Sequence, residues 1–173
     1  TSLEPPEKVY GLMLYEGVEY GYICITPFTE EALDRVTHTY RSGRWAERFQ
    51  GDRGRERLRW SAPDSAHFET TSVSAPPLVS GDEQFDRWTE WGEDDRPQAA
   101  YVAAIRTICV DVLRALDGEG AFGPRREAVT LMLESRDGNE TPAERRSLVE
   151  ALNPPAVVAR YDHHVRVVAD DPG

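Results

Sequence analysis

The chain has 173 residues, with 31 acidic and 20 basic side chains, and a formal net charge of −11. This length suits one compact domain with a single core and is too short for two comfortable domains. The negative charge repels phosphate at long range, which argues against a general nucleic-acid binder and favours a basic protein partner. The sequence has no run of about 18 apolar residues and no N-terminal signal pattern. We therefore expect a cytoplasmic protein without a membrane partner.

The N-terminal part predicts a flexible tail over 1–8 followed by a β-hairpin. Residues 9–16 and 20–26 are rich in aromatic and β-branched side chains, and the short gap between them has the length of a hairpin turn. Pro27 is expected to end the second strand, because proline lacks the N–H group that a ladder requires.

Thr29 is a typical helix N-cap, and the two acidic residues after it suit the first turn of a helix. This pattern predicts a helix over 30–42, with His38 away from its core-facing stripe. A short strand is expected over 58–60. The Pro-, Ser- and Thr-rich stretch 61–80 predicts turns and irregular backbone.

The longest helix is predicted over 97–116, because Pro97 suits its first turn and Gly118 suits its end. We expect it to be the central helix of the core. Its apolar stripe consists of Tyr101, Ile105, Ile108, Val112, Leu113 and Leu116.

Residues 128–135 predict a buried strand. A Thr-Pro-Ala-Glu capping box at 141–144 predicts a helix over 142–152. The branched residues of 157–168 indicate a last strand, and a polar tail over 169–173 is expected after it.

These elements predict an α+β fold, with a mixed or antiparallel sheet that begins with a β-hairpin and is packed by three or four helices. Because no linker divides the chain, residues 9–168 are expected to form a single domain. Cys24 and Cys109 are too few and too far apart for a disulfide framework or a zinc ribbon, so buried free thiols are expected.

The only basic run contains seven arginines between Arg41 and Arg59, interleaved with aromatic residues. Such a pattern is compatible with contact to nucleic acid, because arginine pairs with phosphate and aromatic rings stack on bases. Glu47, Asp52 and Glu56 dilute the run. We therefore expect internal salt bridges to the acidic segment described next rather than binding of nucleic acid.

The best functional lead is an acidic segment, residues 82–95, in which carboxylates surround Phe85 and two tryptophans. A short helix is expected over 82–92. Tryptophan anchors and carboxylates that steer a basic partner are typical of protein interfaces. The plainer alternative is that Phe85 and one tryptophan pack into the core while the acidic groups are solvated. The predicted partner-binding residues are Asp82, Glu83, Asp86, Trp88, Glu90, Trp91, Glu93, Asp94 and Asp95.

A rival interpretation is an enzyme with a noncanonical site near Trp60, Asp64 and His67, in which the aspartate orients a histidine that acts as general base. A deep pocket that gathers Asp64 and His67 with Arg59 would favour this interpretation. A third is a scaffold or regulatory subunit without an inhibitory role. Motifs for nucleophilic catalysis are lacking, and the histidine spacings define no metal site, so we assign no catalytic residue and expect no metal or cofactor.

Three stretches of the chain carry a family resemblance: VYGLMLYEGVEYGYICITPFTEEAL, the RWSAPD stretch at 59–64, and the helix that leads through AFG at 121–123 into AVTLMLES. They resemble a bacterial family called domain of unknown function 4303. The resemblance covers about 9–137 and is interrupted at Ser65, where an aromatic residue is expected.

This resemblance implies a small intracellular α+β protein. Some members of the family are thought to be immunity proteins of polymorphic toxin systems, and no catalytic residues are established for them. Combined with the charge placement in the acidic segment, the resemblance makes an immunity-type inhibitor of a cationic toxin domain the preferred function.

Overall fold

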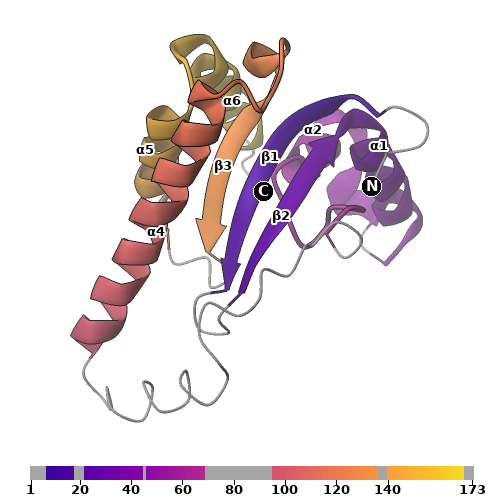
Figure 1. Cartoon of the computed structure of the whole chain (residues 1–173). Coiled ribbons are helices and arrows are strands. Elements are labelled where there is room, and N and C mark those ends of the chain that lie inside the picture. The colour runs from indigo at the N-terminus through magenta and orange to yellow at the C-terminus, as the bar shows by residue number, and fades with distance from the viewer. Residues whose placement is uncertain (1–6, 18–21, 45, 69–94, 136–139, 170–173) are drawn as a thin grey trace.

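The computed structural model describes residues 7–17, 22–44, 46–68, 95–135 and 140–169. In these residues a three-stranded sheet has the order β2-β1-β3 (Figure 1). β1 (Val9–Gly17) and β2 (Tyr22–Thr29) pair antiparallel, and β3 (Thr130–Ser135) lies parallel to β1. The predicted α+β class, with a mixed sheet that begins with a hairpin, is confirmed.

β2 extends through Pro27 to Thr29, so the expectation that Pro27 ends this strand is wrong. Pro27 stands opposite Leu12 of β1, and β2 lies at the edge of the sheet formed by the described strands. An edge strand tolerates proline because its missing N–H group need not belong to the ladder.

α1 (Glu30–Ser42) follows β2 directly and has the predicted bounds. The Oγ1 atom of Thr29 accepts a hydrogen bond from the backbone N–H of Ala32 at 3.1 Å, which is the expected N-cap. After a 3₁₀ turn, α2 (Gly51–Leu58) ends where a short strand was expected. The expected strand over 58–60 is wrong at Leu58, which ends the helix. Leu58 and Gly54 are both buried and lie one helical turn apart, and a stretch of three residues is too short to reveal this helical spacing.

The C-terminal part contains α4 (Asp95–Gly118), α5 (Pro142–Leu152) and α6 (Pro155–Ala169). The predicted capping box of α5 is present. The expected strand over 157–168 is wrong, because these residues belong to α6. Pro155 occupies the first position of this helix, where proline is favoured, and the buried Val157, Val158 and Tyr161 follow helical spacing.

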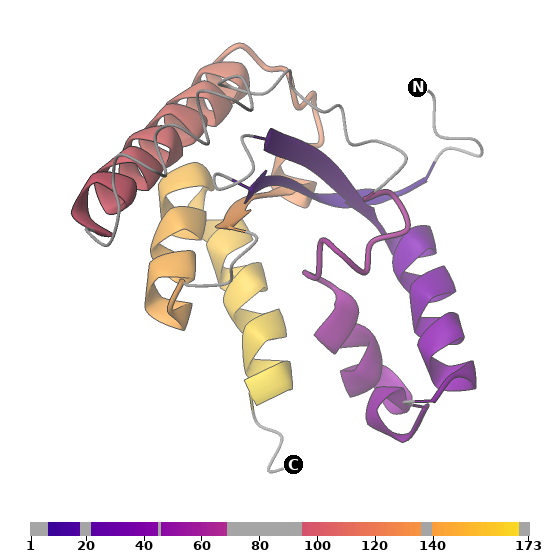
Figure 2. The same cartoon turned by 90° about the horizontal axis from the view of Figure 1, so that it is seen from below.

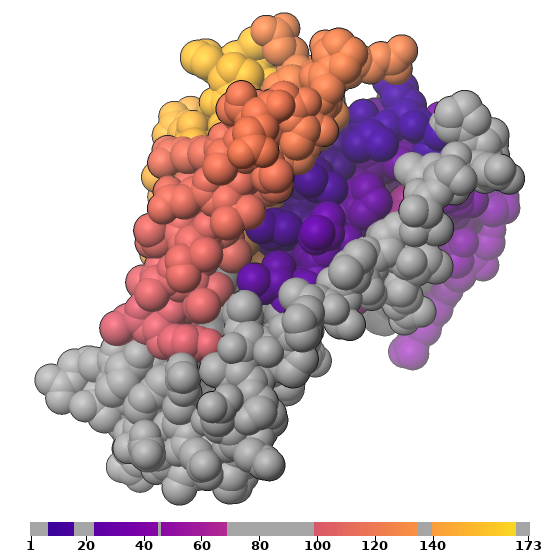
Figure 3. All heavy atoms as spheres, viewed as in Figure 1, coloured from indigo at the N-terminus to yellow at the C-terminus, as the bar shows by residue number. Residues whose placement is uncertain are grey.

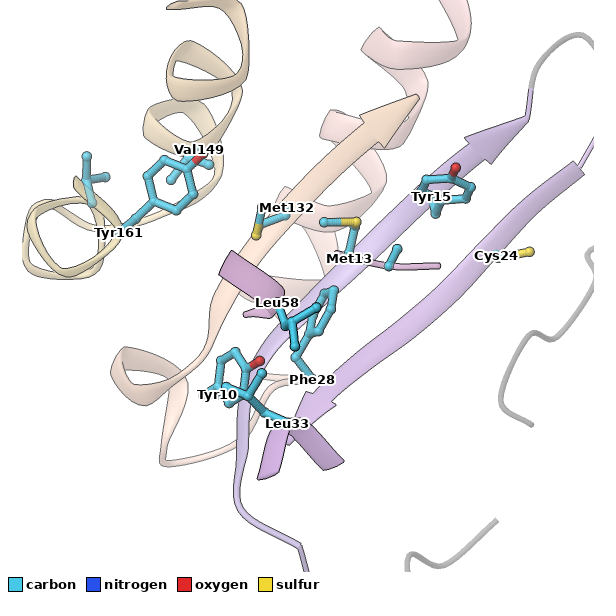
Figure 4. Close-up of a cluster of buried hydrophobic side chains, with 12 residues drawn as sticks. Tyr10, Met13, Tyr15, Cys24, Phe28, Leu33, Leu58, Met132, Val149 and Tyr161 are labelled. Atoms are coloured by element: carbon cyan, nitrogen blue, oxygen red, sulfur yellow. The ribbon is translucent and has the colours of Figure 1, made fainter. Parts of the chain in front are cut away.

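Helices cover both faces of the sheet (Figure 2). Met13 of β1 and Met132 of β3 point to the face that α1, α2 and α6 cover, in the cluster shown in Figure 4. Leu14 and Leu131 point to the opposite face, against α4. The alternation of side chains along each strand therefore produces two cores, one on each face.

α4 covers only part of its face of the sheet. Cys109 and Leu113 are buried against the strands, whereas Ile108, Val112 and Leu116 are 56%, 48% and 37% exposed. The expectation that α4 is the central core helix is therefore wrong for half of its stripe. Figure 3 shows the strands visible at the surface beside it.

Both cysteines are buried free thiols, as predicted. None of the helices in the described residues combines the length and the hydrophobicity that crossing a membrane would require.

Candidate functional site

The predicted partner-binding residues fall almost entirely outside the described residues. Residues 82–94 of the acidic segment, and with them the short helix expected over 82–92, lie outside the described residues. Asp95 is described and is the first residue of α4. Their assignment to a partner-binding surface stays a prediction.

The basic run supplies an ion-pair network between α1 and α2. Arg55 contacts Glu30 at 2.5 Å and Asp34 at 2.7 Å. Arg59 binds both carboxylate oxygens of Glu56, at 2.5 and 2.9 Å, and also contacts Glu30 at 3.1 Å. Burial works against the charge of Arg59, but hydrogen bonds to the two glutamates keep its pKa above the ordinary value. Both arginines therefore form internal salt bridges, but these partners lie on α1 and α2. The expected salt bridges to the acidic segment stay a prediction, because residues 82–94 lie outside the described residues.

Another arginine of the run ties the backbone together. Arg41 donates to the carbonyl oxygens of Phe49 at 2.9 Å and Gly51 at 2.5 Å. The remaining four also take part in interactions within the protein: Arg44, Arg48, Arg53 and Arg57. Arg41, Arg55 and Arg59 therefore belong to the framework of α1 and α2 and are not cations left available for phosphate.

The histidine of the rival enzymatic interpretation is bound to a different carboxylate. His67 is 7% exposed, and its Nε2 lies 2.6 Å from Oε2 of Glu7 and 3.3 Å from Oγ1 of Thr29. Glu7 also contacts Arg35 at 2.9 Å. Burial alone would raise the pKa of Glu7, but hydrogen bonds from Thr29, Arg35 and His67 lower it to about 2. This cluster fastens Glu7 to the start of α1.

Asp64, the proposed orienting residue, accepts hydrogen bonds from the hydroxyl of Tyr40 and from Oγ of Ser61, the latter at 2.6 Å. The cavity beside Asp64 has a volume of about 10 Å³, which is room for about one water molecule. The geometry therefore gives no support to a catalytic Asp64–His67 pair.

A larger cleft lies between α2 and α6, with a volume of about 400 Å³. α2 and the turn after it contribute one wall, α6 the other, and β3 and α5 close one side. Its polar and aromatic lining residues are Glu56, Arg57, Trp60, Ser61, Glu134, Arg145, Tyr161 and His164.

A carboxylate–imidazole pair joins the two walls of this cleft. Nδ1 of His164 lies 2.8 Å from Oε2 of Glu56. Burial, and then the positive charge of Arg59, lower the pKa of His164, so its imidazole is mainly neutral at pH 7. Burial would raise the pKa of Glu56, but the hydrogen bonds from Arg59 lower it. Because a carboxylate only accepts hydrogen bonds, Nδ1 of His164 carries the proton and Nε2 has a free lone pair.

Further polar groups surround this pair. Arg145 contacts Glu134 at 3.0 Å, and burial raises the pKa of Glu134 although the arginine opposes the shift. Within the described residues, Nε1 of Trp60 and Nε of Arg145 are buried without a hydrogen-bond partner. The cleft is thus a polar site, and two of the residues that line it each have a buried donor without a partner.

The sequence-based reasoning missed both members of the pair. Glu56 was considered only as a dilution of the basic run, and His164 fell within the strand expected over 157–168. The one available signal was the helical spacing of apolar residues after Pro155, which brings His164 to the side of α6 that faces α2. The described residues contain no cluster of three or more potential metal ligands.

The fold and the cleft define an α+β domain whose mixed sheet begins with a hairpin and whose helices α2 and α6 enclose a polar site. The chain belongs to the family described as "Domain of unknown function (DUF4303)", which matches residues 2–154. The match includes α2, β3 and α5 but ends before α6, so His164 lies beyond it. Neither a curated protein nor a solved structure matches the chain.

Proposed function

We propose that the protein is an immunity-type inhibitor, which binds a basic protein partner through the acidic segment and neutralises a cationic toxin domain in the cytoplasm. The tryptophans of the segment would fill pockets on the partner. Its carboxylates would attract the positively charged partner and so speed association, and the bound segment would cover the partner's functional site.

The observation that carries this proposal is the use of the basic run inside the fold. Arg55 and Arg59 are neutralised by carboxylates of α1 and α2, and Arg41 is held by backbone carbonyls. The acidic segment, in contrast, has seven carboxylates and a single arginine, Arg87. An acidic chain whose basic run supports its own framework favours a cationic partner over a nucleic acid.

The test is affinity purification from the native host with the wild-type chain and two variants. One variant carries Trp88→Ala, Glu90→Arg and Trp91→Ala. The matched control, Glu119→Arg, makes the same charge reversal at an exposed position after α4. A retained protein is identified, purified and titrated against the wild-type chain, and its toxicity is measured in cells with and without this chain.

We expect a basic protein to be retained by the wild type and by the Glu119→Arg control but lost from the triple variant. Retention should weaken as salt is added, because electrostatic steering is screened. Coexpression of the wild-type chain should abolish the toxicity of the partner. If the triple variant retains the same proteins as the wild type, or if the partner is not toxic, the inhibitor proposal fails.

A further inference from the structure

None of the described residues that line the cleft between α2 and α6 belongs to the acidic segment, and their chemistry is that of a ligand site. Its volume of about 400 Å³ falls within the usual range of sites for small molecules. A packing defect would be lined by apolar side chains, whereas this cleft contains two carboxylates, two guanidinium groups and an imidazole.

The charges in the lining balance one another. Glu134 is paired with Arg145, and Glu56 is paired with Arg59 behind the wall of the cleft. Arg57 also takes part in an interaction within the protein. The described lining residues therefore offer neither the unpaired cations that suit a phosphate nor the free carboxylates that suit an amine, and they favour an uncharged ligand.

The hydrogen-bonding groups in the cleft are complementary to hydroxyl groups. The polar contact of the His164 ring within the described residues is made by Nδ1, so Nε2 is left as an acceptor. The side chain of Tyr161 also lines the cleft, and burial raises the pKa of its hydroxyl, which therefore stays a donor. A hydroxyl group both donates and accepts, so adjacent hydroxyls on one ligand can satisfy both residues.

Apolar surface completes the site. Trp60, Val165 and Val168 line the same cleft. Trp60 is held in place by edge-on ring contacts with Tyr10 at 5.3 Å and Phe28 at 5.9 Å between centroids. A rigid aromatic and aliphatic wall beside hydrogen-bonding groups suits a ring with apolar C–H faces and polar edges.

We infer that this cleft binds an uncharged, hydroxylated ring compound, and that Nε2 of His164 accepts a hydrogen bond from one of its hydroxyl groups. Glu56 acts as a positioning residue that holds the imidazole in the Nδ1–H form. A free sugar and the ribose of a nucleoside share this chemistry, and the experiment below distinguishes them.

The test uses the full chain, labelled with ¹⁵N, and follows the imidazole nitrogens by NMR during separate titrations with ribose, adenosine and adenosine monophosphate at neutral pH. His164→Asn is the informative variant, because the asparagine amide places a donor near the position of Nδ1 but removes Nε2. His163→Asn is the matched control, since His163 is the adjacent, exposed residue of α6. Circular dichroism establishes that both variants are folded.

We expect saturable shifts of the Nε2 resonance of His164 in the wild type and in His163→Asn. Affinity should fall about tenfold in His164→Asn, the size expected for one lost hydrogen bond. Binding of ribose identifies a free sugar as sufficient, and binding of adenosine alone identifies a nucleoside. The inference is overturned if neither probe shifts His164, if His164→Asn binds as tightly as the wild type, or if adenosine monophosphate binds more tightly than adenosine.

Discussion

Replacing Glu56 by glutamine should destabilise the fold by about 3 kcal/mol. Glu56 accepts two hydrogen bonds from Arg59 and one from His164, and its side chain is only 13% exposed. Glutamine keeps one carbonyl oxygen, but its NH₂ group then faces the donors of the guanidinium. Breaking a buried ion pair costs about 3–5 kcal/mol, and we take the lower value because Glu30 still contacts Arg59 at 3.1 Å.

Urea unfolding at pH 7, followed by tryptophan fluorescence, measures this change as a lower midpoint with an unchanged slope. Glu47→Gln is the matched control at an exposed position and should change the free energy of unfolding by less than about 0.5 kcal/mol. The variant should also titrate His164 at lower pH, because the Glu56 carboxylate opposes the lowering of the pKa of His164 by burial. A loss of stability no larger than that of the control would refute the assigned role of Glu56 between α2 and α6.

Three further predictions concern the framework around the site. Gly54→Ala should lower the free energy of unfolding by about 2–3 kcal/mol, because the added Cβ would lie 2.1 Å from the backbone of Phe49. Alanine is ordinarily the better helix former, so an equilibrium unfolding experiment that shows stabilisation would contradict this packing. Asn153→Ala should lower the free energy of unfolding by about 3 kcal/mol, which calorimetry would detect as a lower Tm. Its amide makes three hydrogen bonds of 2.8 Å, two of them to the backbone of Leu131, and a loss near zero would show that they contribute nothing. Because the pKa of Glu7 is lowered to about 2, the unfolded state binds more protons in acid than the folded state does, so the free energy of unfolding should fall as the pH drops from about 5 to 2. Glu7→Gln should flatten this pH dependence, and an equal slope of the free energy of unfolding against pH in both proteins would contradict the prediction.

Helix starts were predictable wherever the signal is local. The hydroxyl of Thr29 caps α1, and the box formed by Thr141 and Glu144 caps α5, because these contacts lie within one turn of the residues that make them. α6 was missed for the opposite reason. Its valines favour strands as isolated residues, but the helix buries Val157 and Val158 where α6 contacts α2 and β3.

The exposed apolar residues of α4 show that a local sequence pattern does not predict which apolar side chains are buried. Ile108 and Leu113 are equally apolar in sequence, yet only Leu113 reaches the sheet. The direction of each side chain depends on how the helix lies across β1 and β3, and periodicity alone does not contain that information.

By itself the sequence determined the acidic character of the protein, its hairpin, its capped helices and its α+β class, since each follows from composition or from contacts between near neighbours. Only the tertiary structure decided which charges meet. Glu56 and His164 lie on helices far apart along the chain, and they become partners because α2 and α6 cover the same face of the sheet. Their protonation states follow from that burial, which no local pattern records.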